Sequence, residues 1–118
     1  MEHFRRDEVA GNPIPGRVVQ RAIGRDGRSP SELLSVGFAR FSATAGVMGP
    51  HRHGEEAIYV LAARDGWIEW GPAADELDER CELEAGMVLH VRPGEWHVFR
   101  HADGGFVDIL FVFSPPIW

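Results

Sequence analysis

The residues best able to do chemistry in this chain lie in the stretch GPHRHGEEAIYVL, residues 49–61. His51 and His53 are one residue apart, and Glu55 and Glu56 follow after a single glycine. Side chains at positions i and i+2 of an extended strand point to the same side, so both imidazoles can be directed at one point. With a carboxylate at the start of the following apolar run they make a two-histidine, one-carboxylate set. Such a set holds a divalent metal and leaves coordination positions open.

Two questions stay open from these residues alone. A pair of histidines at this spacing is also common on surfaces, where each ring satisfies a local hydrogen bond. Glu55 and Glu56 point to opposite faces if both lie in one strand, so only one of them should join the histidines. The stretch GMVLHVRPGEWHVFRH, residues 86–101, favours the metal site, because it predicts a strand, a Pro-Gly turn and a second strand that carries His97. A fold that pairs these strands with residues 49–61 would deliver a third imidazole.

The elements that must position these side chains are short strands. Apolar runs separated by Gly, Pro and Asp turn signals such as RDG and ADGG predict strands near residues 18–23, 33–41, 56–63, 67–70, 81–83, 87–91, 96–100 and 106–113. No helical periodicity of useful length interrupts them, so we expect an all-β sandwich or barrel. The stretch GNPIPG, with two prolines and two glycines, should break any regular element. We therefore predict a loosely ordered lead-in over residues 1–16 and one barrel domain over residues 17–118.

Composition narrows the classes of function. The chain has 118 residues and a formal net charge of −6, which suits a single acidic domain and disfavours nucleic acid as a partner. All twelve basic residues are arginine, so a lysine Schiff base and a P-loop are both excluded. Cys81 is the one cysteine, which excludes an intrachain disulfide and a cysteine-rich zinc site. The chain shows neither a secretory signal nor an apolar run long enough to span a bilayer, so we expect a cytoplasmic protein without membrane contact.

The two histidine stretches resemble the paired motifs of the cupin superfamily. In the first motif His51 and His53 match the histidine pair, and Glu56 matches the glutamate, because Leu61 then falls at the end of the family's apolar strand. The spacing from His53 to Glu56 is one residue shorter than in the family pattern. This shortening predicts a tight turn at Gly54 and a more distant carboxylate.

In the second motif Gly86, Gly94 and His97 match in register. The ending VDILFVFSPP, residues 107–116, also resembles the closing strand of many small cupins, so the likeness covers residues 33–116. The resemblance implies a double-stranded β-helix, the jelly-roll barrel of the cupins.

The resemblance also implies a metal site with three histidines and one glutamate: His51, His53, Glu56 and His97. The shortened spacing leaves two other arrangements open, with Glu55 in place of Glu56 or with the three histidines alone. Such ligands suit iron, manganese, nickel, cobalt or zinc.

The resemblance further implies that the protein is a metal-binding enzyme acting on a small organic molecule, as a dioxygenase, isomerase, lyase or cyclase. The alternative is a non-catalytic cupin that binds or senses a small ligand.

Four further residues are candidates for the pocket wall: Arg40, Tyr59, His90 and Phe99. Each has an ordinary structural alternative, such as a surface arginine or a histidine bonded to the backbone.

Both faces of residues 57–61 are apolar, which suggests that the outer face is covered as well. We therefore expect a homodimer.

Overall fold

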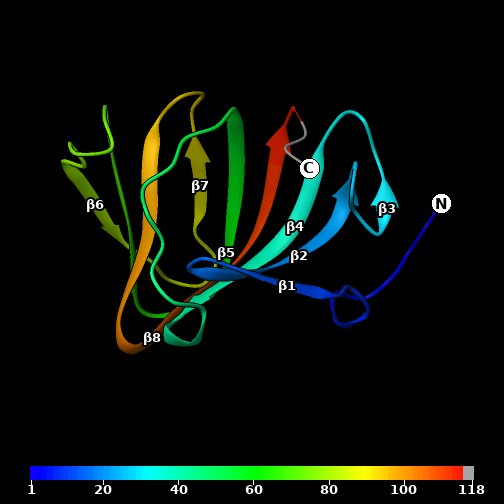
Figure 1. Cartoon of the computed structure of the whole chain (residues 1–118), viewed down its shortest axis with the longest axis horizontal. Helices are drawn as coiled ribbons and strands as arrows, with labels where there is room; N and C mark the ends of the chain where they lie inside the picture. Colours follow the sequence, from blue (N-terminus) through cyan, green and yellow to red (C-terminus); the bar gives the residue numbers. More distant parts are fainter. Residues whose placement is uncertain (116–118) are drawn as a thin grey trace.

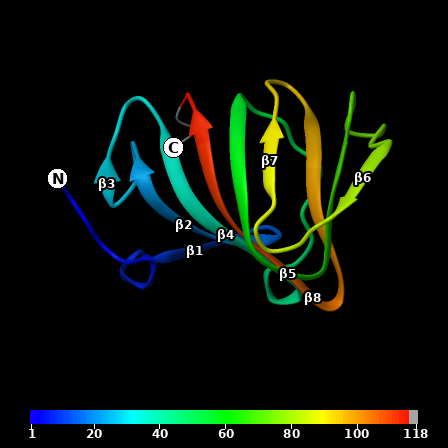
Figure 2. The same cartoon turned by 180° about the vertical axis from the view of Figure 1, so that it is seen from behind.

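The computed structural model describes residues 1–115 and is built almost entirely of strands, so the predicted all-β class is confirmed. Within these residues one sheet runs in the order β1-β2-β4-β8-β5-β6, with β3 added to β2 and β7 added to β5. The sheet curls over itself into a jelly-roll barrel (Figures 1 and 2). The elements are η1 Arg6–Glu8, β1 Gly11–Ile14, β2 Arg17–Gly24, β3 Ser29–Pro30, β4 Ser35–Ser42, η2 Ala43–Ala45, β5 Glu55–Gly71, β6 Glu79–Glu82, β7 Val88–Val91 and β8 Trp96–Ser114.

Two long strands, β5 and β8, form the body of the barrel. Their antiparallel register runs from Glu55 opposite Ser114 to Gly71 opposite Trp96. The prediction of four separate strands in these two regions was wrong, because the RDG and ADGG stretches continue the strands instead of ending them. The register shifts between Arg64 and Gly66, where the chain bends and stays paired.

Gly66 is required at this bend by close packing. A Cβ atom there would overlap the side chain of Val107 and would lie 3.0 Å from the carbonyl oxygen of Phe106. Asp65 beside it has a φ of 48°, a left-handed conformation that aspartate tolerates better than most residues. The turn residues of the RDG stretch therefore mark a bulge inside one strand.

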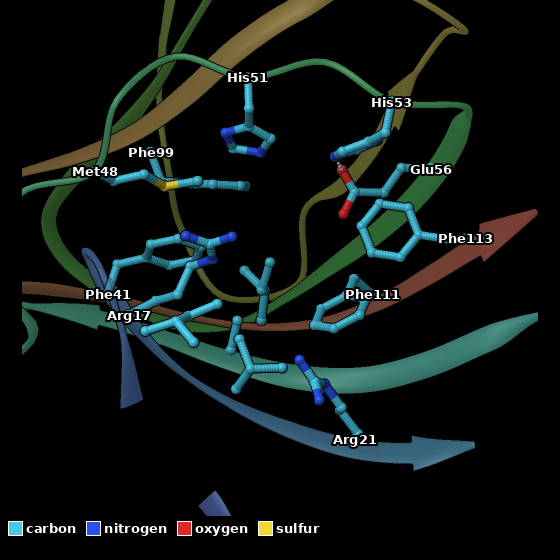
Figure 3. A pocket seen from close by; sticks show the side chains of 14 residues that line it. Arg17, Arg21, Phe41, Met48, His51, His53, Glu56, Phe99, Phe111 and Phe113 are labelled. Atoms are coloured by element: carbon cyan, nitrogen blue, oxygen red, sulfur yellow. Dashed lines mark ion pairs between the residues drawn. The ribbon is translucent and has the colours of Figure 1, made fainter. Parts of the chain in front are cut away.

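The interior of the barrel is apolar. Strand alternation directs one set of side chains inward, and Val60, Val98 and Val107 are completely buried. Side chains from β2, β4, β5 and β8 line a cavity inside the curve (Figure 3). No helix in residues 1–115 is long and apolar enough to cross a membrane.

The N-terminal segment contains regular structure that the sequence did not predict. Strand β1 pairs with β2 along Gly11–Ile14, within the stretch that was expected to break any element. Pro13 is tolerated because β1 lies at the end of the strand order, where an edge strand need not donate every hydrogen bond. The domain boundary at residue 16 stays a prediction, and residues 116–118, assigned to the barrel from the sequence, lie outside the described residues.

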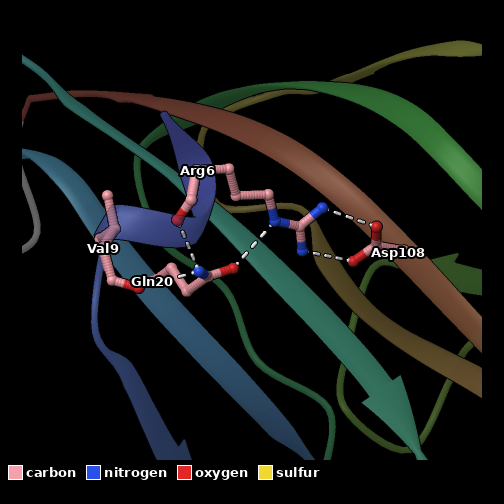
Figure 4. Close-up of polar contacts among 4 residues, drawn as sticks. All are labelled: Arg6, Val9, Gln20 and Asp108. Carbon is pink, nitrogen blue, oxygen red and sulfur yellow. Dashed lines mark hydrogen bonds and ion pairs between the residues drawn. The ribbon is translucent and has the colours of Figure 1, made fainter. Parts of the chain in front are cut away.

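A partly buried ion pair attaches this segment to the outside of the barrel (Figure 4). Arg6 donates two hydrogen bonds of 2.7 Å to the carboxylate of Asp108 on β8, and its Nε donates to Gln20 on β2 at 2.9 Å. Gln20 in turn donates to the carbonyl oxygens of Arg6 and Val9. Asp108 is only 8% exposed, so its charge depends on the arginine for compensation. The hydrogen bond with Asp108 raises the pKa of Arg6.

Replacing Arg6 with alanine should destabilise the protein by about 1–3 kcal/mol, because a nearly buried carboxylate then loses its partner. Urea unfolding at pH 7 measures the change. Arg25→Ala is the matched control, since the ion pair between Arg25 and Glu32 is exposed and should contribute no more than about 0.5 kcal/mol. Equal effects of the two substitutions would show that the Arg6 pair does not fasten the segment.

Candidate metal centre

Three histidines from two distant parts of the chain meet at one point. One ring nitrogen from each of His51, His53 and His97 lies within 4.8 Å of the other two. The backbone brings them together, because His51 and His97 exchange a pair of N–H to carbonyl hydrogen bonds of 3.0 and 2.9 Å. The loop before β5 is thereby paired with the start of β8. The alternation predicted for His51 and His53 then directs both rings toward His97.

Hydrogen bonds to the backbone orient two of the rings. Nδ1 of His97 lies 2.9 Å from the carbonyl oxygen of Glu95, and Nδ1 of His51 lies 3.4 Å from that of Gly49. A carbonyl oxygen can only accept, so Nδ1 carries the proton in these bonds and Nε2 keeps its lone pair. Metal-binding histidines are held in this way, with one nitrogen anchored and the other directed at the site.

Glu56 completes the cluster and Glu55 faces away from it. Oε1 of Glu56 lies 3.4 Å from Nε2 of His97 and 3.7 Å from Nε2 of His53, and the residue is only 4% exposed. Glu55 is on the opposite face of β5, where it pairs with His90 at 2.6 Å. Strand alternation therefore separates the two carboxylates as expected.

The shortened spacing before Glu56 is absorbed by a tight passage at Gly54. A Cβ atom on Gly54 would lie 3.3 Å from both the carbonyl oxygen of Ser114 and Cδ of Pro115. Oε1 of Glu56 lies close to two of the three rings, but its carboxylate is not among the ligand atoms that lie within 4.8 Å of one another, so the expectation of a more distant carboxylate stays a prediction. Coordination of a metal by Glu56 stays a prediction as well.

Burial dominates the electrostatics of the cluster. Burial, reinforced by the neighbouring His97, lowers the pKa of His51 to about 3 and that of His53 to about 4. Both rings are therefore neutral at pH 7 and have a lone pair available. Burial also raises the pKa of Glu56. All three shifts arise mainly because burial disfavours the charged form of each side chain.

The cluster fits a divalent metal by its unsatisfied atoms as well as by its composition. Oε1 of Glu56 and Nε2 of His97 are buried and have no hydrogen-bond partner within residues 1–115. Unpaired buried polar atoms are costly, and a bound ion would supply the contacts that both atoms lack. Imidazole nitrogens with one carboxylate are ligands for manganese, iron, cobalt, nickel and zinc.

The cluster opens on a cavity of about 180 Å³ with mainly apolar walls. His51, His53 and Glu56 lie at one side of it, as Figure 3 shows. The remaining wall is largely aromatic and aliphatic, and includes four phenylalanines: Phe41, Phe99, Phe111 and Phe113. A cavity of this kind can hold a small organic molecule against the cluster.

One of the four sequence-predicted pocket residues lines this cavity, namely Phe99. Arg40 lies on the outer face of β4, stacked 4.2 Å from the ring centre of Phe106, because its neighbours on the strand take the inward positions. Tyr59 is 45% exposed on the outer face of β5. His90, the partner of Glu55, lines a separate cavity of about 260 Å³. The structure thus places these three outside the cavity that His51, His53 and Glu56 line, although His97 shares the second cavity with His90.

Two charged residues of the cavity wall were missed from the sequence, namely Arg17 and Arg21 on β2. They alternate with Val19 in the stretch RVVQR, so the three side chains share the inward face of the strand. The sequence did contain a signal for this placement, namely two arginines at alternate positions of an otherwise apolar strand.

Comparison with known proteins concerns the fold. No protein-family model matches the sequence, and no curated protein matches it significantly. The structure is similar to that of the polyketide cyclase RemF from Streptomyces resistomycificus, with a TM-score of 0.76 at 22% identity over 98% of this chain and 82% of that chain. The chain has the cupin fold.

Two other solved structures have a similar architecture. A protein from Planctomyces limnophilus has a TM-score of 0.74 at 18% identity, covering 100% of this chain and 91% of that one. The oxalate decarboxylase of Lactobacillus farciminis, solved as a formate complex, has a TM-score of 0.71 at 18% identity over 98% of this chain and 33% of that one. At identities this low the likeness to a cupin concerns architecture and not activity.

Replacing Glu56 with glutamine should weaken Zn²⁺ or Mn²⁺ binding at least about tenfold, because the substitution removes a charged donor while keeping the side-chain shape. Glu55→Gln is the matched control and should bind metal like the wild type. Competition with a chromophoric chelator measures both affinities. The metal-free Glu56→Gln protein should be at least as stable as wild type, since a buried charge is removed. Unchanged metal affinity in Glu56→Gln would exclude that carboxylate as a ligand.

Proposed function

We propose that this protein is a metal-dependent enzyme that acts on a small organic molecule inside the barrel, as a dioxygenase, isomerase, lyase or cyclase. The observation that carries the proposal is the convergence of three imidazoles and a buried carboxylate, of which His51, His53 and Glu56 line one side of an apolar cavity. Among the similar structures are proteins described as a polyketide cyclase, a DMSP lyase and an oxalate decarboxylase. These descriptions support a catalytic use of the fold without choosing the reaction.

The residues of the cluster have distinct tasks in this proposal. His51, His53 and His97 provide nitrogen donors, two of them held neutral by burial. Glu56 provides the one negative charge and offsets part of the charge of a cation. A bound divalent metal would supply a Lewis acid for a carbonyl or enolate oxygen, or a centre for oxygen chemistry if it is iron. The phenylalanine walls keep water away from the substrate and strengthen every polar contact made there.

Ligand binding without turnover is the second candidate. One observation favours it: the side chains that line the cavity within residues 1–115 include no acid or base other than the cluster itself and two arginines. A reaction that needs a separate proton donor would lack one. A sensing or storage role needs only the metal and the cavity. Turnover of a bound ligand is the measurement that separates the two candidates.

Both candidate functions require a bound metal, so metal analysis of the purified protein tests both of them. We expect close to one equivalent of a transition metal per chain, with most of it lost in His53→Ala because one donor is removed. His101→Ala is the matched control, since His101 lies outside the cavity and bonds its neighbour's backbone. If the wild type holds no metal and takes up none of iron, manganese, cobalt, nickel or zinc, the proposed function is wrong.

We further propose a homodimer that covers the outer face of β5 and β7. Tyr59 and Val88 are cross-strand neighbours there and are 45% and 74% exposed. Exposed apolar neighbours on a sheet face are typical of an interface.

Size-exclusion chromatography with light scattering should therefore give twice the mass of one chain. Val88→Arg should shift the protein to a monomer, because a charge would be buried in the interface. Leu33→Arg should not, since Leu33 is an exposed apolar residue outside β5 and β7. A monomeric wild type would contradict this proposal.

A further inference from the structure

The cavity contains two positive charges facing the metal cluster. Arg17 and Arg21 extend from β2 into the cavity, and His51, His53 and Glu56 lie across it (Figure 3). They project from the same side of β2 as Val19, so both guanidinium groups are directed inward by strand alternation. Both arginines therefore line the cavity while staying partly exposed.

The guanidinium group of Arg17 has N–H donors that could bind an acceptor group of a ligand. The side chain is half-buried, and burial lowers its pKa while the charge of Glu56 opposes that shift. Its Nη1 donates to the carbonyl oxygen of Pro15 at 2.9 Å, and no ion pair within residues 1–115 includes it. A guanidinium group has five N–H donors, so most of its capacity is available to a ligand.

The charge balance inside the cavity is the reverse of that of the whole chain. The protein has a formal net charge of −6, yet the charged side chains that residues 1–115 place in the cavity wall are two arginines and one glutamate. A cation held by the cluster would make this interior more positive still. A positive site with apolar walls attracts small anions and favours them over neutral molecules.

The remaining wall sets the size and character of the anion. Four phenylalanines leave a cavity of about 180 Å³, and a dry apolar cavity of about 150 Å³ holds one molecule of benzene. The space therefore suits one small ring or a short chain in addition to an acid group. The planar fork of arginine matches a carboxylate through two parallel hydrogen bonds.

We propose that the cavity binds a small organic carboxylate, with the acid group on the guanidinium of Arg17, the apolar part among the phenylalanines, and Arg21 adding a second positive charge. The inference rests on the proposed function for its role in catalysis and names the substrate class of that site. Arg17 is then the residue that selects acids over neutral analogues.

Titration calorimetry with two matched pairs of probes tests this selection: benzoate against benzamide, and propanoate against propanamide. Each is titrated into metal-free and Zn²⁺-loaded wild type. We expect each acid to bind about tenfold more tightly than its amide in both forms, because the arginine contribution does not require the metal.

Arg17→Gln should abolish this preference and leave the Zn²⁺ affinity and the melting temperature close to wild type. Arg17→Lys, which keeps the charge and loses the fork, should retain part of the preference. Arg40→Gln is the matched control, since Arg40 is an arginine on the outer face of the barrel, and it should behave like wild type.

The outcomes separate this inference from the proposed function. Equal binding of acids and amides by the metal-free wild type, or unchanged benzoate binding in Arg17→Gln, would overturn the inference even if Zn²⁺ binds fully. Acid selection that depends on Arg17 in a protein that binds no metal would support the inference and overturn the proposed metal-dependent enzyme.

Discussion

The antiparallel pairing of β5 with β8 is the constraint on which the site depends. In this ladder Glu56 lies opposite Phe113 and His97 lies opposite Trp70, so the two site residues are near opposite ends of it. A flat ladder of that length would separate them by about 45 Å. Their side chains are instead 3.4 Å apart, so the ladder must curl until its ends meet. The bulge at Gly66 and the twist of the sheet make that curvature possible.

Closure of the ladder concentrates polar groups where the barrel would otherwise be apolar. Glu56 and His97 are nearly or completely buried, and their facing atoms lack hydrogen-bond partners within residues 1–115. Such an arrangement opposes folding, so the surrounding apolar packing must offset its cost. Natural proteins retain locally destabilising arrangements of this kind at functional sites. The same reasoning applies to Arg17, whose charge is half-buried on the opposite wall of the cavity.

Part of this site could be predicted from local sequence because strand periodicity is a local property. The spacing of His51 and His53 indicates that both rings share a face, and the adjacent positions of Glu55 and Glu56 indicate that their carboxylates do not. The structure agrees on both points. The turn signals were less reliable. An RDG stretch looks the same whether it ends a strand or bends it, and only the packing of Gly66 against Val107 distinguishes the two.

The sequence by itself determined the all-β class, the alternation along each strand and the candidate metal ligands. These follow from side-chain type and a repeat of two residues. Tertiary structure alone decided which of the alternating faces became the interior. It directed Arg17 and Arg21 into the cavity and left Arg40 outside, although all three lie on apolar strands. The reason is that inside and outside are defined by the curl of the whole sheet, which depends on contacts between residues far apart in the chain.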